Sequence, residues 1–340
     1  MAKWSISTIN SLRRCNRQYY FAHIAANHGR KNAFRREAYE LKRMQNFQMW
    51  PGSVVDKFIE TEIIPNVKKL ESKDFELLAE KAVELAKKQY DFSKKKLFSD
   101  PKVKAGNHKQ TFTILQTHKL NTEYSDSNIE EVYEKVHRAI KRFPEVIIPT
   151  SGTNLLEYLK EASWMLPNVM NWSFKVDNST VSPQIDLFLI HNNKPVVIDW
   201  KLSASYVTDY SRQLIVCALS VMNWYKKRSG SSENPSMDDY SLFEVNLLKS
   251  TDNVSSHELN IERASEIIDY INLTGSDLEL LLGNRTFEEI DIEEFDITDK
   301  DTTCAFCNFQ KLCASILING FEYEKATFNK HVSNFQFEWD

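Results

Sequence analysis

Long apolar runs and a signal-like N-terminus are both missing from this chain of 340 residues. No stretch approaches the about 20 apolar residues that a helix needs to cross a bilayer. The first residues, MAKWSISTIN, hold no apolar segment before a small-residue cleavage site. We therefore expect a cytoplasmic protein without a membrane partner. At 42% hydrophobic and 26% charged residues, it can bury the core of one elaborated domain or of two.

A strong net charge is also lacking, because the formal charge is only −4. Its distribution is uneven, however, since ten Lys and Arg residues face only Glu37 and Glu40 within residues 1–50. A second basic run follows at Lys94, Lys95 and Lys96, and residues 288–301 are strongly acidic. A solvated surface explains these runs about as well as phosphate binding does, so charge alone decides nothing.

Glycine and proline are scarce, at 8 and 9 residues, and no repeat or low-complexity linker divides the chain. Helix-like spacing at 54–72, 75–97 and 127–143 is followed by strand-like character over 155–201. An amphipathic helix over 209–228 and a strand over 241–250 complete the pattern. We predict an α/β fold with a mixed central sheet flanked by helices and a helical N-terminal insertion. Its domains would be 1–150, a core at 151–255, and 256–340.

The most informative segment is a predicted hairpin with Asn192 and Asn193 at its tip, where Asn tolerates positive φ. This tip places Asp186 opposite Asp199, with Cβ atoms roughly 5 Å apart, and puts Lys201 on the same face. Opposed carboxylates repel each other, and a divalent cation with oxygen ligands removes that cost. A surface hairpin with scattered charges is the alternative, but the catalytic interpretation is favoured because the acidic pair is in register.

These residues resemble the PD-(D/E)XK nuclease superfamily, in which one strand ends in Asp and the next carries an acidic-x-Lys triplet. Asp186 and Asp199-Trp200-Lys201 match that pattern. The RecB-like branch adds a Gln on the following helix, matched by Gln213, although its usual Tyr position holds Cys217. The resemblance implies a PD-(D/E)XK core in which Asp186, Asp199 and the Trp200 carbonyl bind Mg²⁺ or Mn²⁺. Lys201 would assist the attacking water, and Gln213 would lie near Lys201 or the DNA backbone.

The same branch carries a metal-binding His on an upstream helix, and here Asp56 occupies that position in PGSVVDKFIETEI. A carboxylate also ligates Mg²⁺ or Mn²⁺, so Asp56 is the expected ligand and Glu60 the alternative. Glu161 resembles an acidic residue that the family often has before the first Asp.

Four of the five cysteines form a further pattern, with Cys304, Cys307 and Cys313 spaced C-x2-C-x5-C and Cys15 near the N-terminus. Such spacing favours metal ligation over disulfides, and it does not separate a [4Fe–4S] cluster from Zn²⁺. AddB-type and CRISPR-associated RecB-like exonucleases show a similar arrangement. That resemblance implies a [4Fe–4S] cluster joining the two ends of the chain, with Cys217 left as a packing residue.

The resulting hypothesis is a metal-dependent DNA nuclease that acts on single-stranded or end-containing DNA. Its partners would be DNA and, by resemblance, a helicase or another DNA-processing subunit. One alternative is a catalytically inactive, nuclease-like DNA-binding or scaffold subunit of a larger DNA-processing or defence complex. Another is a zinc-stabilised interaction protein with an incidental acidic hairpin.

Overall fold

The computed structural model describes residues 3–27, 32–100, 102–202, 210–229, 234–286 and 289–319. The chain divides into two compact units, each assembled from separate stretches of sequence. The terminal unit comprises Met1–Gln45, Tyr90–Thr122 and Asp277–Asp340, and the sheet unit comprises Asn46–Gln89 and Glu123–Ser276. Each of the three domains predicted from the sequence is one continuous range, whereas each of these units combines separate stretches of the chain. No helix among the described residues is long and apolar enough to span a membrane.

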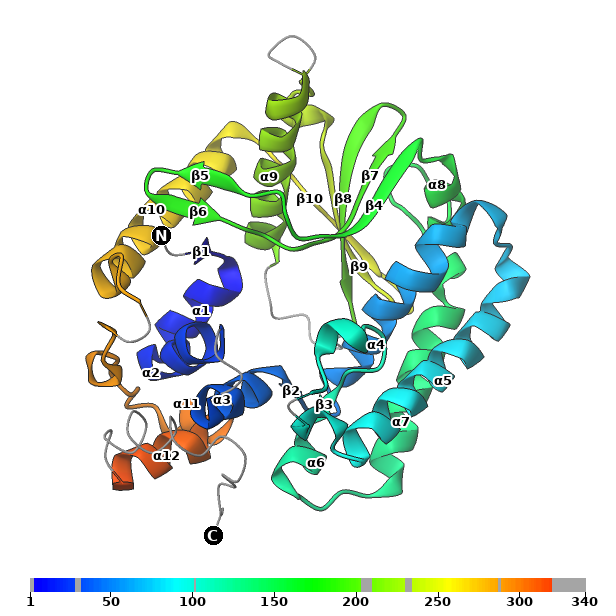
Figure 1. The fold of residues 1–340 in the computed structure, drawn as a ribbon. Coiled ribbons are helices and arrows are strands. Elements are labelled where there is room, and N and C mark those ends of the chain that lie inside the picture. The colour runs from blue at the N-terminus through cyan, green and yellow to red at the C-terminus, as the bar shows by residue number, and fades with distance from the viewer. Residues whose placement is uncertain are drawn as a thin grey trace. The chain divides into compact units, whose positions relative to one another are not determined.

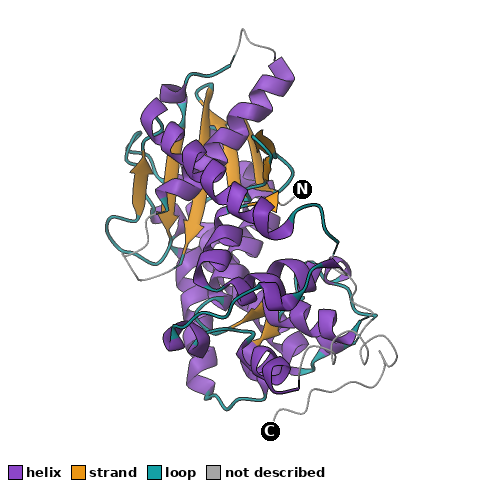
Figure 2. Ribbon diagram, turned by 90° about the vertical axis from the view of Figure 1, so that its left-hand side faces the viewer, coloured by secondary structure: helices purple, strands orange, loops and turns teal. Residues whose placement is uncertain are grey.

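A five-stranded sheet with the order β10-β9-β8-β7-β4 forms the centre of the sheet unit, and its strands are labelled in Figure 1 and drawn in orange in Figure 2. Its strands are β4 (Trp164–Val169), β7 (Ile185–His191), β8 (Lys194–Lys201), β9 (Ser241–Asn246) and β10 (Val254–His257). β8 pairs with β9 in parallel, and the other pairs are antiparallel, so the predicted mixed sheet is confirmed. β5 (Phe174–Val176) and β6 (Ser179–Val181) form a separate hairpin.

The central hairpin has the predicted turn and register. Asn192 and Asn193 adopt φ values of 49° and 60°, as a two-residue hairpin turn of this type requires. Pairing runs from His191 opposite Lys194 to Leu187 opposite Ile198. Six consecutive residues of β8 are buried, which explains why the central strand is almost continuously apolar in sequence.

Helices pack on this sheet. The helix α9 (Ser211–Ser229) contacts β8, β9 and β5, and α8 (Leu155–Glu161) contacts β7. The strand-like character expected from residue 155 is wrong at its start, because Asn154 accepts a hydrogen bond from the Glu157 amide at 2.9 Å and begins α8. The predicted 54–72 helix begins at Trp50 as α4 (Trp50–Phe58) and continues through π and 3-10 turns to Lys69.

The remaining elements are mostly helical. They are β1 (Lys3–Trp4), α1 (Ile6–Arg14), α2 (Asn16–Tyr19), α3 (Ala33–Arg43), β2 (Met44–Gln45), α5 (Phe75–Lys94), β3 (Ile114–Leu115), α6 (Gln116–Leu120), α7 (Asp126–Lys141), α10 (Ile261–Leu282), α11 (Asp301–Ala305) and α12 (Gln310–Asn319). The predicted helices at 75–97 and 127–143 correspond to α5 and α7.

The two ends of the described chain are joined inside the terminal unit. Arg17 donates its backbone amide to the Asp296 carbonyl at 3.0 Å and its Nε to the Phe295 carbonyl at 2.8 Å. Phe21 stacks on Phe309 with ring centroids 5.4 Å apart, and Asn308 donates to the Leu41 carbonyl at 3.1 Å. Part of the basic N-terminal run is therefore structural, since Arg17 and Arg35 are 4% and 8% exposed. Residues 30 and 31 of that run lie outside the described residues.

Candidate active site

The acidic pair lies at the end of the β7–β8 hairpin that is opposite its turn. Continuing the register by one step places Asp186 opposite Asp199 on one face of the sheet. Asp186 Oδ2 accepts a hydrogen bond from the Trp200 backbone amide at 3.0 Å. The Lys201 ammonium forms an ion pair with Asp199 Oδ2 and lies 3.9 Å from the centroid of the Tyr210 ring. Asp186, Asp199 and Lys201 thus form one cluster, as the register predicts.

Electrostatics in this cluster disfavour charge on the carboxyl groups. Burial first, and then the neighbouring Asp199, raises the pKa of Asp186 to about 7. Asp199 is only 4% exposed, and its burial raises its pKa against the opposing effect of Lys201. Burial would lower the pKa of Lys201, but the carboxylates of Asp199 and Asp186 outweigh it and the net shift is upward. Without a further cation, Asp186 is held partly protonated near neutral pH.

Gln213 reaches the cluster from the first turn of α9. Its side-chain amide donates to Asp199 Oδ1 at 2.8 Å, so it fixes the orientation of this carboxylate. The resemblance places Gln213 near the lysine or the DNA backbone, whereas its contact here is with the acid itself. Asp199 Oδ2 is buried and has no hydrogen-bond partner among the described residues apart from the ion pair with Lys201.

Asp56 approaches the same cluster from α4. Its pKa is raised well above the ordinary range, first by burial and then by the charges of Asp186 and Asp199. The side chain is nevertheless solvent-exposed. The carboxylate therefore feels the charges of both aspartates while it keeps contact with solvent. Glu60 instead pairs with Lys57 at 2.8 Å, so the structure favours Asp56 over Glu60 at this cluster.

Trp200 supports the site through its backbone and its ring. Its amide holds Asp186, and its indole, 5% exposed, packs against Phe143 with centroids 5.7 Å apart. The role of its carbonyl as a metal ligand stays a prediction. Cys217 is 3% exposed and donates weakly to the Gln184 carbonyl at 3.6 Å, as expected for a packing residue.

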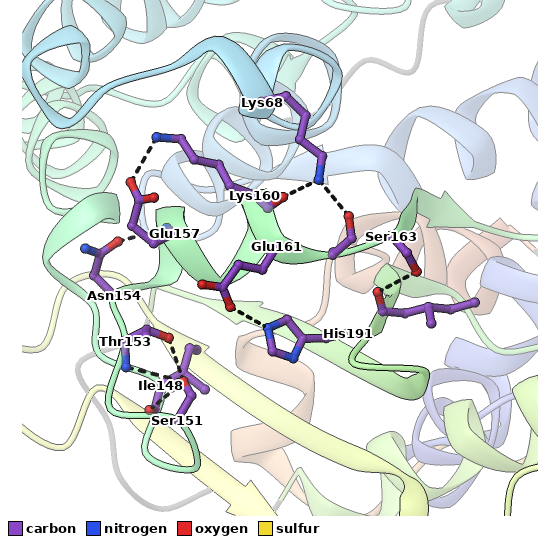
Figure 3. A network of polar contacts seen from close by, with 12 residues as sticks. Lys68, Ile148, Ser151, Thr153, Asn154, Glu157, Lys160, Glu161, Ser163 and His191 are labelled. Carbon is purple, nitrogen blue, oxygen red and sulfur yellow. Dashed lines mark hydrogen bonds and ion pairs between the residues drawn. The ribbon is translucent and has the colours of Figure 1, made fainter.

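Glu161 belongs to another part of the sheet unit. It lies at the end of α8 and pairs with His191 at 3.1 Å (Figure 3). His191 is five residues along β7 from Asp186, which corresponds to about 16 Å. Glu161 therefore lies apart from the acidic cluster in this structure, and its resemblance to the family residue stays a prediction. An acidic residue of a preceding helix can pair with either end of a strand, and its sequence position does not specify which.

Two residues that sequence analysis missed lie beside Asp199. Glu244 of β9 is its direct partner across the parallel pair, so both side chains share one face of the sheet. His257 of β10 lies 3.6 Å from Glu244 and lowers the pKa of Asp199. A lone Glu within the apolar strand SLFEVNLL was the available signal, but its place beside Asp199 depends on a non-local strand pairing.

These donors fit a hard divalent cation by their chemistry. Three carboxylates disfavour one another's charge here, so a cation would relieve that cost. In the described part of the chain, however, no three His, Cys, Asp or Glu side chains are arranged as a ready-made metal site. The side chains would need to reorient around an ion.

The four cysteines of the sequence pattern all belong to the terminal unit, although no three of the described cysteines are positioned as a metal site. Cys15, Cys304, Cys307 and Cys313 are all half-buried free thiols. Burial raises the pKa of Cys307, and the charges of Cys15 and Cys304 raise it further. Burial likewise raises the pKa of Cys313 to about 11, against an opposing effect of Arg17. Cys15 Sγ lies 3.9 Å from the Asp296 carbonyl oxygen, 281 residues away along the chain, so the N-terminal and C-terminal segments that carry these thiols meet in this unit.

No curated protein sequence matches the chain. The sequence model of the PD-(D/E)XK nuclease superfamily matches residues 3–314, which include Asp56, the acidic hairpin, Gln213 and all four terminal-unit cysteines. Because that match extends over nearly the whole chain and agrees with the mixed α/β fold, the protein belongs to the PD-(D/E)XK nuclease superfamily.

Proposed function

We propose that the protein is a Mg²⁺- or Mn²⁺-dependent deoxyribonuclease that acts on single-stranded or end-containing DNA. The observation that carries this proposal is the cluster of Asp186, Asp199 and Lys201, in which Gln213 also holds Asp199. Superfamily membership supports nuclease chemistry in general. The choice of DNA and of its single-stranded or end-containing form comes from the RecB-like resemblance.

Each residue has a distinct proposed role. Asp186, Asp199 and Asp56, with the Trp200 carbonyl, would hold the cation. When bound, the cation would supply a water of lowered pKa and stabilise charge on the scissile phosphate. Lys201 is a fixed positive charge beside Asp199, suited to orient the attacking water and to offset developing negative charge.

The position of Lys201 also depends on its neighbours. Its ammonium lies against the face of the Tyr210 ring, and this cation–π contact favours the charged form. Gln213 restricts the rotation of Asp199 by binding Oδ1, which leaves Oδ2 directed toward Lys201. Preorganisation of this kind reduces the reorganisation that a reaction would otherwise require.

The test is cleavage of end-labelled and circular DNA, single- and double-stranded, in Mg²⁺, Mn²⁺ or chelator. We expect metal-dependent cleavage of linear single strands or ends, abolished by chelator. An absence of cleavage in every metal, from protein that binds DNA, would favour an inactive DNA-binding subunit. Asp269→Ala, an exposed acidic change in α10 of the sheet unit, is the matched control for variants of the acidic pair.

We also propose that Cys15, Cys304, Cys307 and Cys313 hold a [4Fe–4S] cluster, with Zn²⁺ as the alternative. Their half-buried positions and mutual electrostatic effects support a shared site. The hydrogen bonds of Arg17 to the Asp296 and Phe295 carbonyls already join the two terminal segments, so a cluster would stabilise contacts that are present without it. Iron and zinc analysis of protein purified without oxygen, with its visible absorption spectrum, distinguishes the two metals.

A further inference from the structure

Three tryptophans of the sheet unit form a parallel stack. Trp172 and Trp224 have centroids 4.5 Å apart at 16°, and Trp164 lies 5.8 Å from Trp224 at 8°. The separation of Trp164 and Trp172 is 6.4 Å at 17°. The indoles come from an edge strand, a loop and a helix, and because they stack on one another, only the outer ring faces of the stack, foremost that of the exposed Trp164, can receive a further ring.

The stack is partly open to solvent and firmly anchored. Trp164 is 37% exposed, and Trp172 and Trp224 are half-buried. The loop that carries Trp172 is fixed to α9, because Ser220 donates to the Trp172 carbonyl and Asn223 donates to the Ser173 carbonyl at 3.1 Å. A tryptophan that only fills a core would not need this exposure, and a rigid exposed ring loses little entropy on stacking with a ligand.

Phe188 connects the stack with the strand that carries Asp186. Phe188 contacts Trp164, Trp172 and Trp224, with centroids 5.5, 5.3 and 6.2 Å away. Phe188 is two residues from Asp186 on β7, so both point to the same face about 7 Å apart along the strand. Trp164 pairs with Ile190, which is four residues and about 13 Å along β7 from Asp186, so a strand of nucleic acid with one phosphate at the acidic cluster would bring bases a few nucleotides away to the indoles.

Exposed cations border the stack. Lys226, Lys227 and Arg228 end α9, and Lys175 lies on β5, which α9 contacts. The Arg228 guanidinium lies 5.1 Å from the Trp224 ring centroid. Two acidic residues lie near the tryptophans in sequence. They are Asp177, in the β5–β6 turn, and Glu161, which pairs with His191. The cations on α9 nonetheless outnumber them, as phosphate binding requires.

We propose that Trp164, Trp172 and Trp224 are a stacking platform for bases of single-stranded nucleic acid, with the α9 cations contacting its phosphates. Unpaired bases stack on aromatic rings, whereas duplex DNA hides its base faces, so the platform selects unpaired strands. This inference rests on the proposed function for its link to cleavage, but the binding itself can be measured alone.

The test is fluorescence anisotropy of a short labelled oligo-dT, and of a matched duplex, with the 340-residue chain in chelator. Trp164→Ala should weaken oligo-dT binding by at least about fivefold, while Trp164→Phe stays near wild type. Ile261→Ala removes a 78% exposed apolar side chain elsewhere in the sheet unit and should leave binding unchanged. Arg228→Gln keeps all three indoles and should reduce the slope of log affinity against log salt by about 0.7.

Thermal unfolding checks that each variant is folded. The proposed platform is overturned if folded Trp164→Ala binds oligo-dT as tightly as wild type does. It is also overturned if wild type binds the duplex more tightly than oligo-dT, or binds neither. If wild type self-associates, and Trp164→Ala abolishes this association without changing DNA binding, the stack is a protein interface. That result would also overturn the proposed platform. If wild type does not cleave DNA, but Trp164→Ala still weakens DNA binding, only the proposed function is refuted and the platform stands.

Discussion

Replacing Asp186 with Asn should stabilise the metal-free protein at alkaline pH while it removes activity. The acid carries a pKa of about 7 instead of 3.8, because burial and Asp199 disfavour its charge. At a pH above both values, holding it ionised costs up to about 4 kcal/mol. Asn is neutral and keeps an oxygen for the Trp200 amide, but it gives up the attraction to Lys201. We expect a net gain of about 1–2 kcal/mol at pH 8.5.

The direction of the pH dependence follows from the raised pKa. Between pH 3.8 and about 7 the folded protein holds the Asp186 proton that the unfolded chain releases. The contribution of this group to stability is therefore greatest at low pH, falls as pH rises through that window, and is constant above it. The free energy of unfolding of Asp186→Asn should lack this pH-dependent contribution, and so should that of wild type in saturating Mg²⁺.

The assay is urea unfolding in chelator at pH 5 and pH 8.5, followed by tryptophan fluorescence. Five of the seven tryptophans belong to the sheet unit, so the signal reports mainly on it. We expect Asp186→Asn to gain stability over wild type at pH 8.5 and to gain little at pH 5. Equal destabilisation at both pH values would refute the electrostatic reasoning, and Asp269→Ala should show neither effect.

Further predictions concern the other site residues. Gln213→Ala should reduce the cleavage rate about tenfold or more at saturating metal, since a hydrogen bond to a charged group is lost; an unchanged rate would remove its positioning role. Asp56→Ala should raise the Mg²⁺ concentration needed for half-maximal activity, while Glu60→Ala should not; the opposite result would exchange their roles. Cys15→Ser should lose bound metal and lower the melting temperature by several degrees, whereas Cys217→Ser should retain its metal; full metal content in Cys15→Ser would contradict the proposed cluster.

The acidic hairpin was predictable because its determinants are local. Two adjacent Asn residues set the turn, and the turn alone fixes which residues of β7 and β8 face each other. The position of Gln213 followed from family resemblance, although its contact with Asp199 did not.

Other features depend on contacts between distant segments. Glu244 meets Asp199 only because β9 pairs with β8 in parallel after a long crossover, and no local pattern specifies that neighbour. Likewise, the segments that make up the two compact units alternate along the chain, so chain order did not predict them. The sequence at the start of α8 resembles a strand because its buried Leu and Tyr residues also suit one, whereas the Asn154 cap begins a helix there.

The most direct test of the central claim is single-turnover cleavage of end-labelled single-stranded DNA by wild type, Asp199→Ala and Lys201→Ala. Binding of the same DNA should be measured in chelator. The shared cluster of Asp186, Asp199 and Lys201 predicts that both variants bind DNA nearly as wild type and cleave it at least about 100-fold more slowly in Mg²⁺ or Mn²⁺. Wild-type cleavage by either folded variant would contradict the assignment of this cluster as the active site.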